Sequence, residues 1–278
     1  MLRLLSIEVQ KLRYNKSARV ISIVYFVLIT FIALIASIEF NFGDINFRVA
    51  DQGIFNFPFI WHFNTYIAAI LKIFLAIVIV SMMANEYSYR TLKQNLIDGI
   101  SKKEFVLSKF ITVVGFAAVS TVFVFVVSMI LGLSFSDYME IGIIFSDLEY
   151  LLAYFIKLVG FFSFCLFLGV LVKRSAYAIG FLVIWWLAEG LLYLLMKWRF
   201  FRDTDIAENV MQFFPLTSMS NLIIEPATRL GAVQSAASQL GENLDKDYEV
   251  GILPLLIVSA WIFLFVYWSF LILKRRDL

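Results

Sequence analysis

Residues 65–84 read TYIAAILKIFLAIVIVSMMA, a run of 20 residues in which Lys72 is the one charged side chain. At 1.5 Å per residue a helix of this length covers about 30 Å, the thickness of the hydrocarbon core of a bilayer. Five further runs of this kind occupy residues 20–38, 110–133, 148–172, 176–196 and 252–273. The sequence therefore predicts an all-α integral membrane fold with six membrane-spanning helices in a single transmembrane domain, residues 1–278.

The composition of the whole chain agrees with a membrane protein. Of the 278 residues, 62% are hydrophobic and 16% are charged, against about 45–50% and about 25% in an average soluble domain. One Cys permits no intrachain disulfide, and one His permits no His-rich metal site. The chain contains no Gly-Lys pair and hence no P-loop for nucleotide phosphates. We therefore expect a non-catalytic chain with no catalytic residues, no metal site and no nucleic-acid partner.

The orientation of the spans follows from the positions of Lys and Arg. The N-terminal segment and the segment 85–109 carry five such residues each, whereas 39–64 carries only Arg48 and 134–147 carries none. Lys and Arg are enriched in the cytoplasmic loops of membrane proteins. Every basic loop falls on one side of a six-span chain, which predicts that both termini are cytoplasmic.

Residues 1–19 precede the first span. Leu2, Leu5, Val9 and Leu12 recur at helical spacing, which places them on one face, with Lys11 on the opposite side. The pattern is typical of a helix that lies in the membrane interface. A basic leader that merely orients the first span is the alternative.

The loop between the second and third spans carries helix-start and helix-stop patterns. Residues 91–94 (Thr-Leu-Lys-Gln) and 101–104 (Ser-Lys-Lys-Glu) both match the capping box, and Gly99 lies where a helix end favours positive φ. We expect a short helix over about 92–98, a break at Gly99, and a second helix that starts near Lys102 and continues into the third span. This arrangement is a compact elbow; an ordinary polar turn is the alternative.

The segment 197–251 is the longest one outside the predicted spans. Its first part is apolar and is interrupted by Pro215 and Pro226. The stretch between these prolines is too short to cross a bilayer, so a re-entrant or interfacial hairpin is expected. The second part, 228–248, is rich in Ala, Gln and Ser and predicts a surface helix followed by an acidic loop.

Three charged residues interrupt the spans: Lys72, Lys157 and Glu189. Charges inside a membrane segment usually pair or face a cavity. We expect Glu189 to pair with at least one of the lysines, because an unpaired ionised carboxylate is the costlier state. Three roles stay open: a structural Lys–Glu bridge, contact with a polar cargo along a translocation path, or snorkelling of the lysines.

The elbow carries a resemblance to a known family. Glu86, Thr91, Leu92, Leu96, Ile100, Ser101 and Lys102 follow one another as in the membrane subunit of type-2 ABC exporters, whereas Arg90 replaces the usual Gly and Gly99 stands where Pro is common. With its leader, six spans and long outer segment, the chain resembles this permease class. The family handles polysaccharides, lipids, peptide antibiotics, drugs and ions, so the resemblance names no cargo.

The resemblance implies partners and a location. It implies two permease copies, identical or related, in contact with membrane lipid, in the bacterial cytoplasmic (inner) membrane. It also implies a separate P-loop ATPase that binds ATP and Mg²⁺, and an elbow that inserts into a cleft of that ATPase. The residues that it assigns to this coupling are Glu86, Arg90, Thr91, Leu92, Lys93, Leu96, Asp98, Gly99, Ser101 and Lys102. A secondary transporter that couples ions through Lys72, Lys157 and Glu189, or a membrane assembly protein without transport, are the alternatives.

Overall fold

The computed structural model describes residues 2–42, 45–48, 53–202, 204–239 and 246–276. The elements in chain order are α1 (Leu2–Tyr14), α2 (Lys16–Ser37), β1 (Glu39–Phe42), β2 (Ile45–Arg48), α3 (Phe59–Ser88), α4 (Thr91–Ile97), α5 (Lys102–Phe135), α6 (Ile141–Ile144), α7 (Glu149–Val172), α8 (Ser175–Leu195), η2 (Met196–Phe200), α9 (Ile206–Met211), α10 (Pro215–Ser220), η3 (Ala227–Arg229), α11 (Gly231–Gln239) and α12 (Ile252–Arg275).

Six of these helices are long and apolar enough to cross a membrane, as the sequence predicted: α2, α3, α5, α7, α8 and α12. Each contains nearly all of one predicted run, and most extend beyond it. The longest of the six is α5, which has 34 residues and therefore a length of about 51 Å at 1.5 Å per residue. A helix of that length projects well beyond the hydrocarbon core, so α5 carries the polar start that was expected near Lys102.

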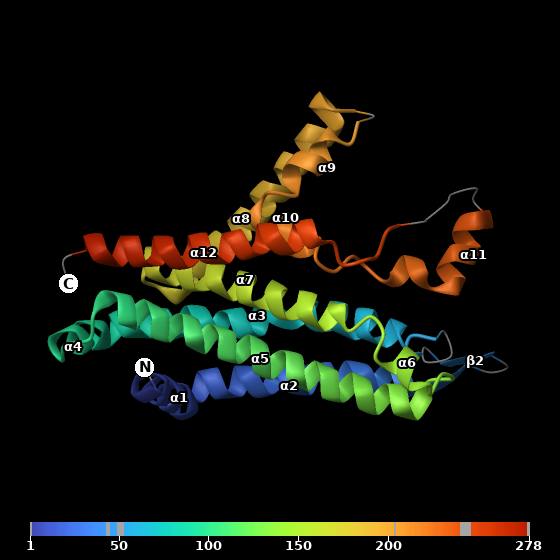
Figure 1. Ribbon diagram of the computed structural model, residues 1–278, viewed down its shortest axis with the longest axis horizontal. Helices are drawn as coiled ribbons and strands as arrows, with labels where there is room; N and C mark the ends of the chain where they lie inside the picture. Colours follow the sequence, from blue (N-terminus) through green and yellow to red (C-terminus); the bar gives the residue numbers. More distant parts are fainter. Residues whose placement is uncertain (1, 43–44, 49–52, 203, 240–245, 277–278) are drawn as a thin grey trace.

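The spans pack around α7. In the most apolar stretch of the fourth span, which contains α7, 72% of the residues are buried. In the corresponding stretch of the fifth span, α8, only 11% are buried. Two glycines let neighbours approach α7 closely: a Cβ on Gly160 would lie 2.9 Å from Val258 of α12, and a Cβ on Gly169 would lie 2.9 Å from Met83 of α3. Small residues at helix crossings are a common device in membrane bundles. α7 is thus the centre of the bundle, and α8 leaves it at an angle (Figure 1).

The bundle has two distinct ends (Figure 1). The start of α1, the elbow helix α4 and the end of α12 lie at one end, and α6, the strand β2 and α11 lie at the other. The first and last helices of the described chain therefore share one end, as an even number of crossings requires. We call the end with α4 the α4 end and the opposite one the outer-loop end.

The helical membrane fold is as predicted, with one addition and one correction. The addition is a short antiparallel hairpin of β1 and β2, whose register pairs Glu39 with Arg48 and Phe40 with Phe47. The leader helix ends at Tyr14 rather than residue 19, and the first span begins at Lys16. The reason for the early start is Asn15, whose side chain accepts a hydrogen bond from the Ala18 amide and caps α2.

Candidate functional site

The elbow consists of two helices separated by a tight break. α4 ends in a Schellman motif, in which the Ile100 amide donates to the Asn95 carbonyl (3.0 Å) and the Gly99 amide donates to the Leu96 carbonyl (3.2 Å). Gly99 has φ +91°, the left-handed conformation expected of it. Ser101 then starts α5 with a complete capping box to Glu104, as predicted. The spacing of Gly99 and Ser101 alone was therefore sufficient to place this break.

The start of α4 differs from the prediction. Thr91 is the first helical residue rather than the N-cap, and the N-cap Arg90 makes no side-chain capping bond. Arg90 has φ +56°, a conformation that favours glycine, in the position where the resembled family usually has glycine. The Thr91 hydroxyl instead donates to Glu86 Oε2 at 2.6 Å. The expected capping box over 91–94 is therefore wrong, and Thr91 connects the elbow to the end of α3.

Glu86 belongs to a buried cluster of four charges, which we call the α1–α3–α5 cluster: Glu8, Lys11, Glu86 and Lys109. Lys109 Nζ lies 2.5 Å from Glu86 Oε1 and 2.5 Å from Glu8 Oε2. Lys11 Nζ lies 2.7 Å from Glu86 Oε1 and 3.3 Å from Glu8 Oε1. Glu8, Glu86 and Lys109 are each at most 4% exposed. Two carboxylates and two ammonium groups balance, which meets the requirement that buried charges be paired.

The cluster joins the leader helix to the elbow. Glu8 and Lys11 lie on α1, Glu86 at the end of α3, and Lys109 on α5. Burial alone would lower the pKa of Lys11, but the hydrogen bonds and charges of Glu86 and Glu8 outweigh burial and raise its pKa above the ordinary 10.5. Lys11 thus faces the bundle as a cation, not away from it as the sequence pattern suggested. Thr91, which donates to Glu86, connects the start of α4 to this cluster.

The exposed surface of α4 is not the one expected from sequence. Leu92 is 2% exposed and packs in the core of this chain, and Leu96 is half-buried, whereas Ile97 is 69% exposed. Tyr89, just before the helix, is 75% exposed. Lys93 and Asp98 are exposed as well. The large apolar side chains exposed here are therefore Ile97 on α4 and Tyr89 just before it, and sequence reasoning missed both.

The remaining elbow residue, Lys102, connects α5 to the end of α12. Its ammonium donates to the carbonyls of Arg276 (2.8 Å) and Lys274 (3.4 Å). Arg276 in turn donates to the Val170 carbonyl at 2.5 Å and to the Tyr87 hydroxyl at 3.1 Å. The ends of α3, α7 and α12 and the start of α5 are therefore bound to one another at the α4 end.

The three intramembrane charges do not meet. The pairing expected for Glu189 is wrong, because every partner that the structure gives Glu189 is a neutral donor. Glu189 Oε1 accepts from Trp185 Nε1 (2.7 Å) and the Leu216 amide (3.1 Å), and Oε2 accepts from the amide and hydroxyl of Thr217 (both 2.9 Å). These donors cost less to bury than a second charge, and they satisfy both oxygens.

The two lysines also have partners other than carboxylates. Lys157, which is 4% exposed, donates to the carbonyls of Ser220 (3.3 Å) and Ile223 (3.5 Å). Lys72 Nζ lies 4.8 Å from the centroid of the Phe161 ring, in cation–π contact. Glu189 and Lys157 thus both contact α10, at different residues, whereas Lys72 contacts Phe161 of α7.

The outer segment folds back onto the bundle. Between Pro215 and Pro226 the chain forms α10 and a buried stretch that includes Leu222 and Ile223. α10 contacts α7, α8 and α12, so this stretch lies against three spans. The surface helix expected after Thr228 is α11, and most of the acidic loop predicted after it, residues 240–245, lies outside the described residues.

One polar network at the outer-loop end was not foreseen. His62, fully buried, hydrogen-bonds through Nε2 to the Ile224 carbonyl (2.7 Å) and through Nδ1 to Arg229 (3.2 Å), and its ring stacks on Tyr150 at 4.3 Å. A carbonyl accepts and a guanidinium donates, so His62 carries its proton on Nε2. The network fixes the outer segment to α3 and α7.

These features define a six-span membrane protein with a structured elbow after the second span. The family model for the ABC-2 family transporter protein matches residues 4–189. The chain belongs to this family. A comparison with curated proteins finds no match. Membership supports a permease role in ABC transport, as a generally non-catalytic membrane component whose ATPase is a partner subunit.

Proposed function

We propose that this chain is the permease of an ATP-driven exporter and that α4 is its contact with a separate ATPase subunit. The observation that supports this role most directly is the exposed Ile97 on a short helix, with the exposed Tyr89 just before it. Buried Leu92 and the hydrogen bond from Thr91 to Glu86 hold this helix against the bundle. An exposed apolar side chain on a rigid support is typical of an interface anchor.

Force applied to α4 has a defined path into the bundle. Thr91 transmits it to Glu86, and the α1–α3–α5 cluster transmits it to the leader helix and the third span. A flexible polar turn would change its own shape under the same force and would not pass the displacement on to the spans. The charge network therefore favours a coupling helix over the alternative of a simple loop.

The orientation that we propose places the α4 end in the cytoplasm of a bacterial cell, with ATP and Mg²⁺ bound by the partner. The distribution of basic residues supports it, because Lys93, Lys102 and Lys109 lie at that end. In a protein whose buried Cys165 is replaced by Ser, a cysteine at Lys93 should react with an impermeant maleimide only after the membrane is opened. A cysteine at Ser238 of α11 should react in intact cells.

A second permease copy is expected against α8. Its apolar side chains Ile184, Leu187 and Leu191 are 57–64% exposed, and the fifth span is the least buried of the six. Lipid can cover such a surface, but a helix that leaves the bundle is also free to pack on its counterpart. A cysteine at Leu187 should form a dimer through a disulfide if the copies meet there.

The decisive experiment is affinity purification of the permease in mild detergent, with the recovery of a P-loop ATPase as the readout. Ile97→Asp should abolish recovery of the ATPase while the permease is inserted and folded. The matched control is Ile141→Asp, because Ile141 is 75% exposed at the outer-loop end. Undiminished ATPase recovery with Ile97→Asp would refute the assignment of α4.

A further inference from the structure

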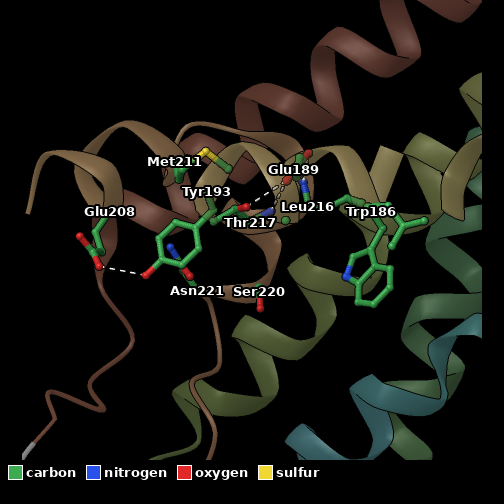
Figure 2. Close-up of a pocket in the computed structure, with 11 residues that line it drawn as sticks. Trp186, Glu189, Tyr193, Glu208, Met211, Leu216, Thr217, Ser220 and Asn221 are labelled. Atoms are coloured by element: carbon green, nitrogen blue, oxygen red, sulfur yellow. Dashed lines mark hydrogen bonds between the residues drawn. The ribbon is translucent and has the colours of Figure 1, made fainter. Parts of the chain in front are cut away.

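A cavity of about 400 Å³ lies between α8 and the outer helices α9 and α10 (Figure 2). The family model ends at Glu189, so Trp186, Leu187 and Glu189 belong to the matched region and the other lining residues lie beyond it. It is lined by Trp186, Leu187, Glu189, Gly190, Tyr193, Glu208, Met211, Leu216, Thr217, Ser220 and Asn221. Its size is that of a site for one small organic molecule.

The charge of this cavity is negative. Two carboxylates line it, and Lys, Arg and His are absent from the lining residues that the structure describes. Glu189 is 6% exposed and bound by neutral donors alone, so its charge is not cancelled by a cation. Glu208 accepts hydrogen bonds from Lys197 (2.6 Å) and Tyr193 (2.9 Å), and the hydrogen bond from Lys197 holds the pKa of Glu208 below its ordinary value. Glu208 is thus paired with Lys197, which lies outside the lining, and Glu189 is the lining carboxylate that has no cationic partner among the described residues and favours a cation.

The walls of the cavity suit an apolar body. Trp186 and Tyr193 stand on either side of it in Figure 2, and Leu187, Met211 and Leu216 complete an apolar lining. The indole of Trp186 belongs to a side chain that is 62% exposed. Aromatic faces attract ammonium and guanidinium groups, and they do so more strongly where water is excluded.

We propose that this cavity binds a hydrophobic organic cation, a single positive group on an aromatic or aliphatic body. A neutral molecule would leave Glu189 without a cationic partner, and an anion would be repelled by it. The inference rests on the proposed function in one respect: it names the class of cargo that the exporter would carry. The binding itself requires neither the ATPase nor ATP.

The test is equilibrium dialysis of the purified full-length protein in nanodiscs against ethidium, an aromatic cation. Phenanthridine, the uncharged parent ring system of ethidium, is the comparison ligand, and empty nanodiscs supply the background. Wild-type protein should bind ethidium at least tenfold more tightly than phenanthridine. Equal affinity for the two would overturn the proposal, since the carboxylates would then contribute nothing.

Two variants with matched controls locate the site. Trp186→Ala and Glu208→Gln should each weaken ethidium binding about five- to tenfold. Trp198→Ala and Asp205→Asn, which remove the same groups from exposed positions outside the lining, should change it less than twofold. Size-exclusion profiles confirm that each variant is folded, and the two variants act on different chemistry. If neither variant weakens binding more than its control, the cavity is not the site.

Failure of this inference is separable from failure of the proposed function. If ethidium binding depends on Trp186 and Glu208 but no ATPase is recovered in the co-purification, the proposed exporter function is refuted and the binding site is supported. If recovery of the ATPase depends on Ile97 but ethidium is not bound selectively, the proposed function is supported and the proposed binding site is refuted.

Discussion

Glu189 and Lys157 hold opposite ends of α10. The carboxylate of Glu189 accepts from the amides of Leu216 and Thr217 in the first turn, and the ammonium of Lys157 donates to the carbonyl of Ser220 in the last. The N-cap residue Phe214 makes no side-chain cap, so Glu189 from α8 supplies it. A helix carries partial positive charge at its N-terminus and partial negative charge at its C-terminus. The two intramembrane charges therefore stabilise one short helix from both sides instead of pairing directly.

Replacement of Glu189 tests this arrangement. Glu189→Leu leaves the Leu216 and Thr217 amides without an acceptor and should cost about 1–3 kcal/mol in the free energy of unfolding. Glu189→Gln keeps one acceptor oxygen and should cost less. The measurement is thermal unfolding in detergent, with the exposed Glu140→Leu as control. A loss no larger than that of Glu140→Leu would contradict the capping role.

The double variant distinguishes two charges on one helix from a direct ion pair. In a direct pair, removal of the second partner restores part of the stability that removal of the first has lost. Here Lys157→Met should lower stability further in the Glu189→Leu background, because each side chain satisfies its own end of α10. Rescue in the double variant would show that the two charges interact directly.

The α1–α3–α5 cluster predicts a different outcome. Lys109 is fully buried between Glu8 and Glu86, so Lys109→Met leaves two buried carboxylates with Lys11 alone. Such a loss costs about 3–5 kcal/mol, whereas Lys103→Met, on an exposed side chain of the same helix, should change little. Glu86→Gln should restore part of the stability of Lys109→Met. Trypsin cleavage at Arg13 reports release of α1, and unchanged cleavage in Lys109→Met would exclude the attachment.

The sequence predicts those features of the structure that depend on residues close together in the chain. The spans, the Gly99 break and the Ser101 cap are set by residues within one or two turns of each other, and all were predicted. The partners of Lys109 lie 23 and 101 residues away. Two of the four donors to Glu189 are backbone amides, which leave no pattern in side-chain identity. The burial of Leu92 and exposure of Ile97 depend on which face of α4 meets the bundle, and seven residues carry too little periodicity to decide it.

The two faces of α4 should separate folding from coupling. Leu92→Asp places a charge in the core and should lower both the yield and the unfolding temperature of the permease. Ile97→Asp should leave both unchanged and affect only the ATPase. The comparison is made on the permease expressed alone. Equal thermal stability of the two variants would mean that Leu92 is not part of the core, and coupling by that face of α4 would then be reconsidered.

Gly99 offers the sharpest test of the elbow backbone. A Cβ at this position meets nothing within 4 Å, so any effect of substitution comes from φ +91°. Gly99→Ala should cost about 1–2 kcal/mol for the left-handed conformation. Gly99→Pro should cost more, since the ring fixes φ near −65° and removes the amide that donates to Leu96, even though proline is common at this position in the resembled family. Arg90→Gly, at φ +56°, should be neutral or stabilising.

Because the strain is local, the measurement is hydrogen exchange of the α4 amides. The control is the exposed Gly142→Ala, at a position that has no positive φ. Faster exchange across α4 in Gly99→Ala and still faster exchange in Gly99→Pro is the expected order, and slower exchange in Gly99→Pro than in Gly99→Ala would show that the break adopts another backbone.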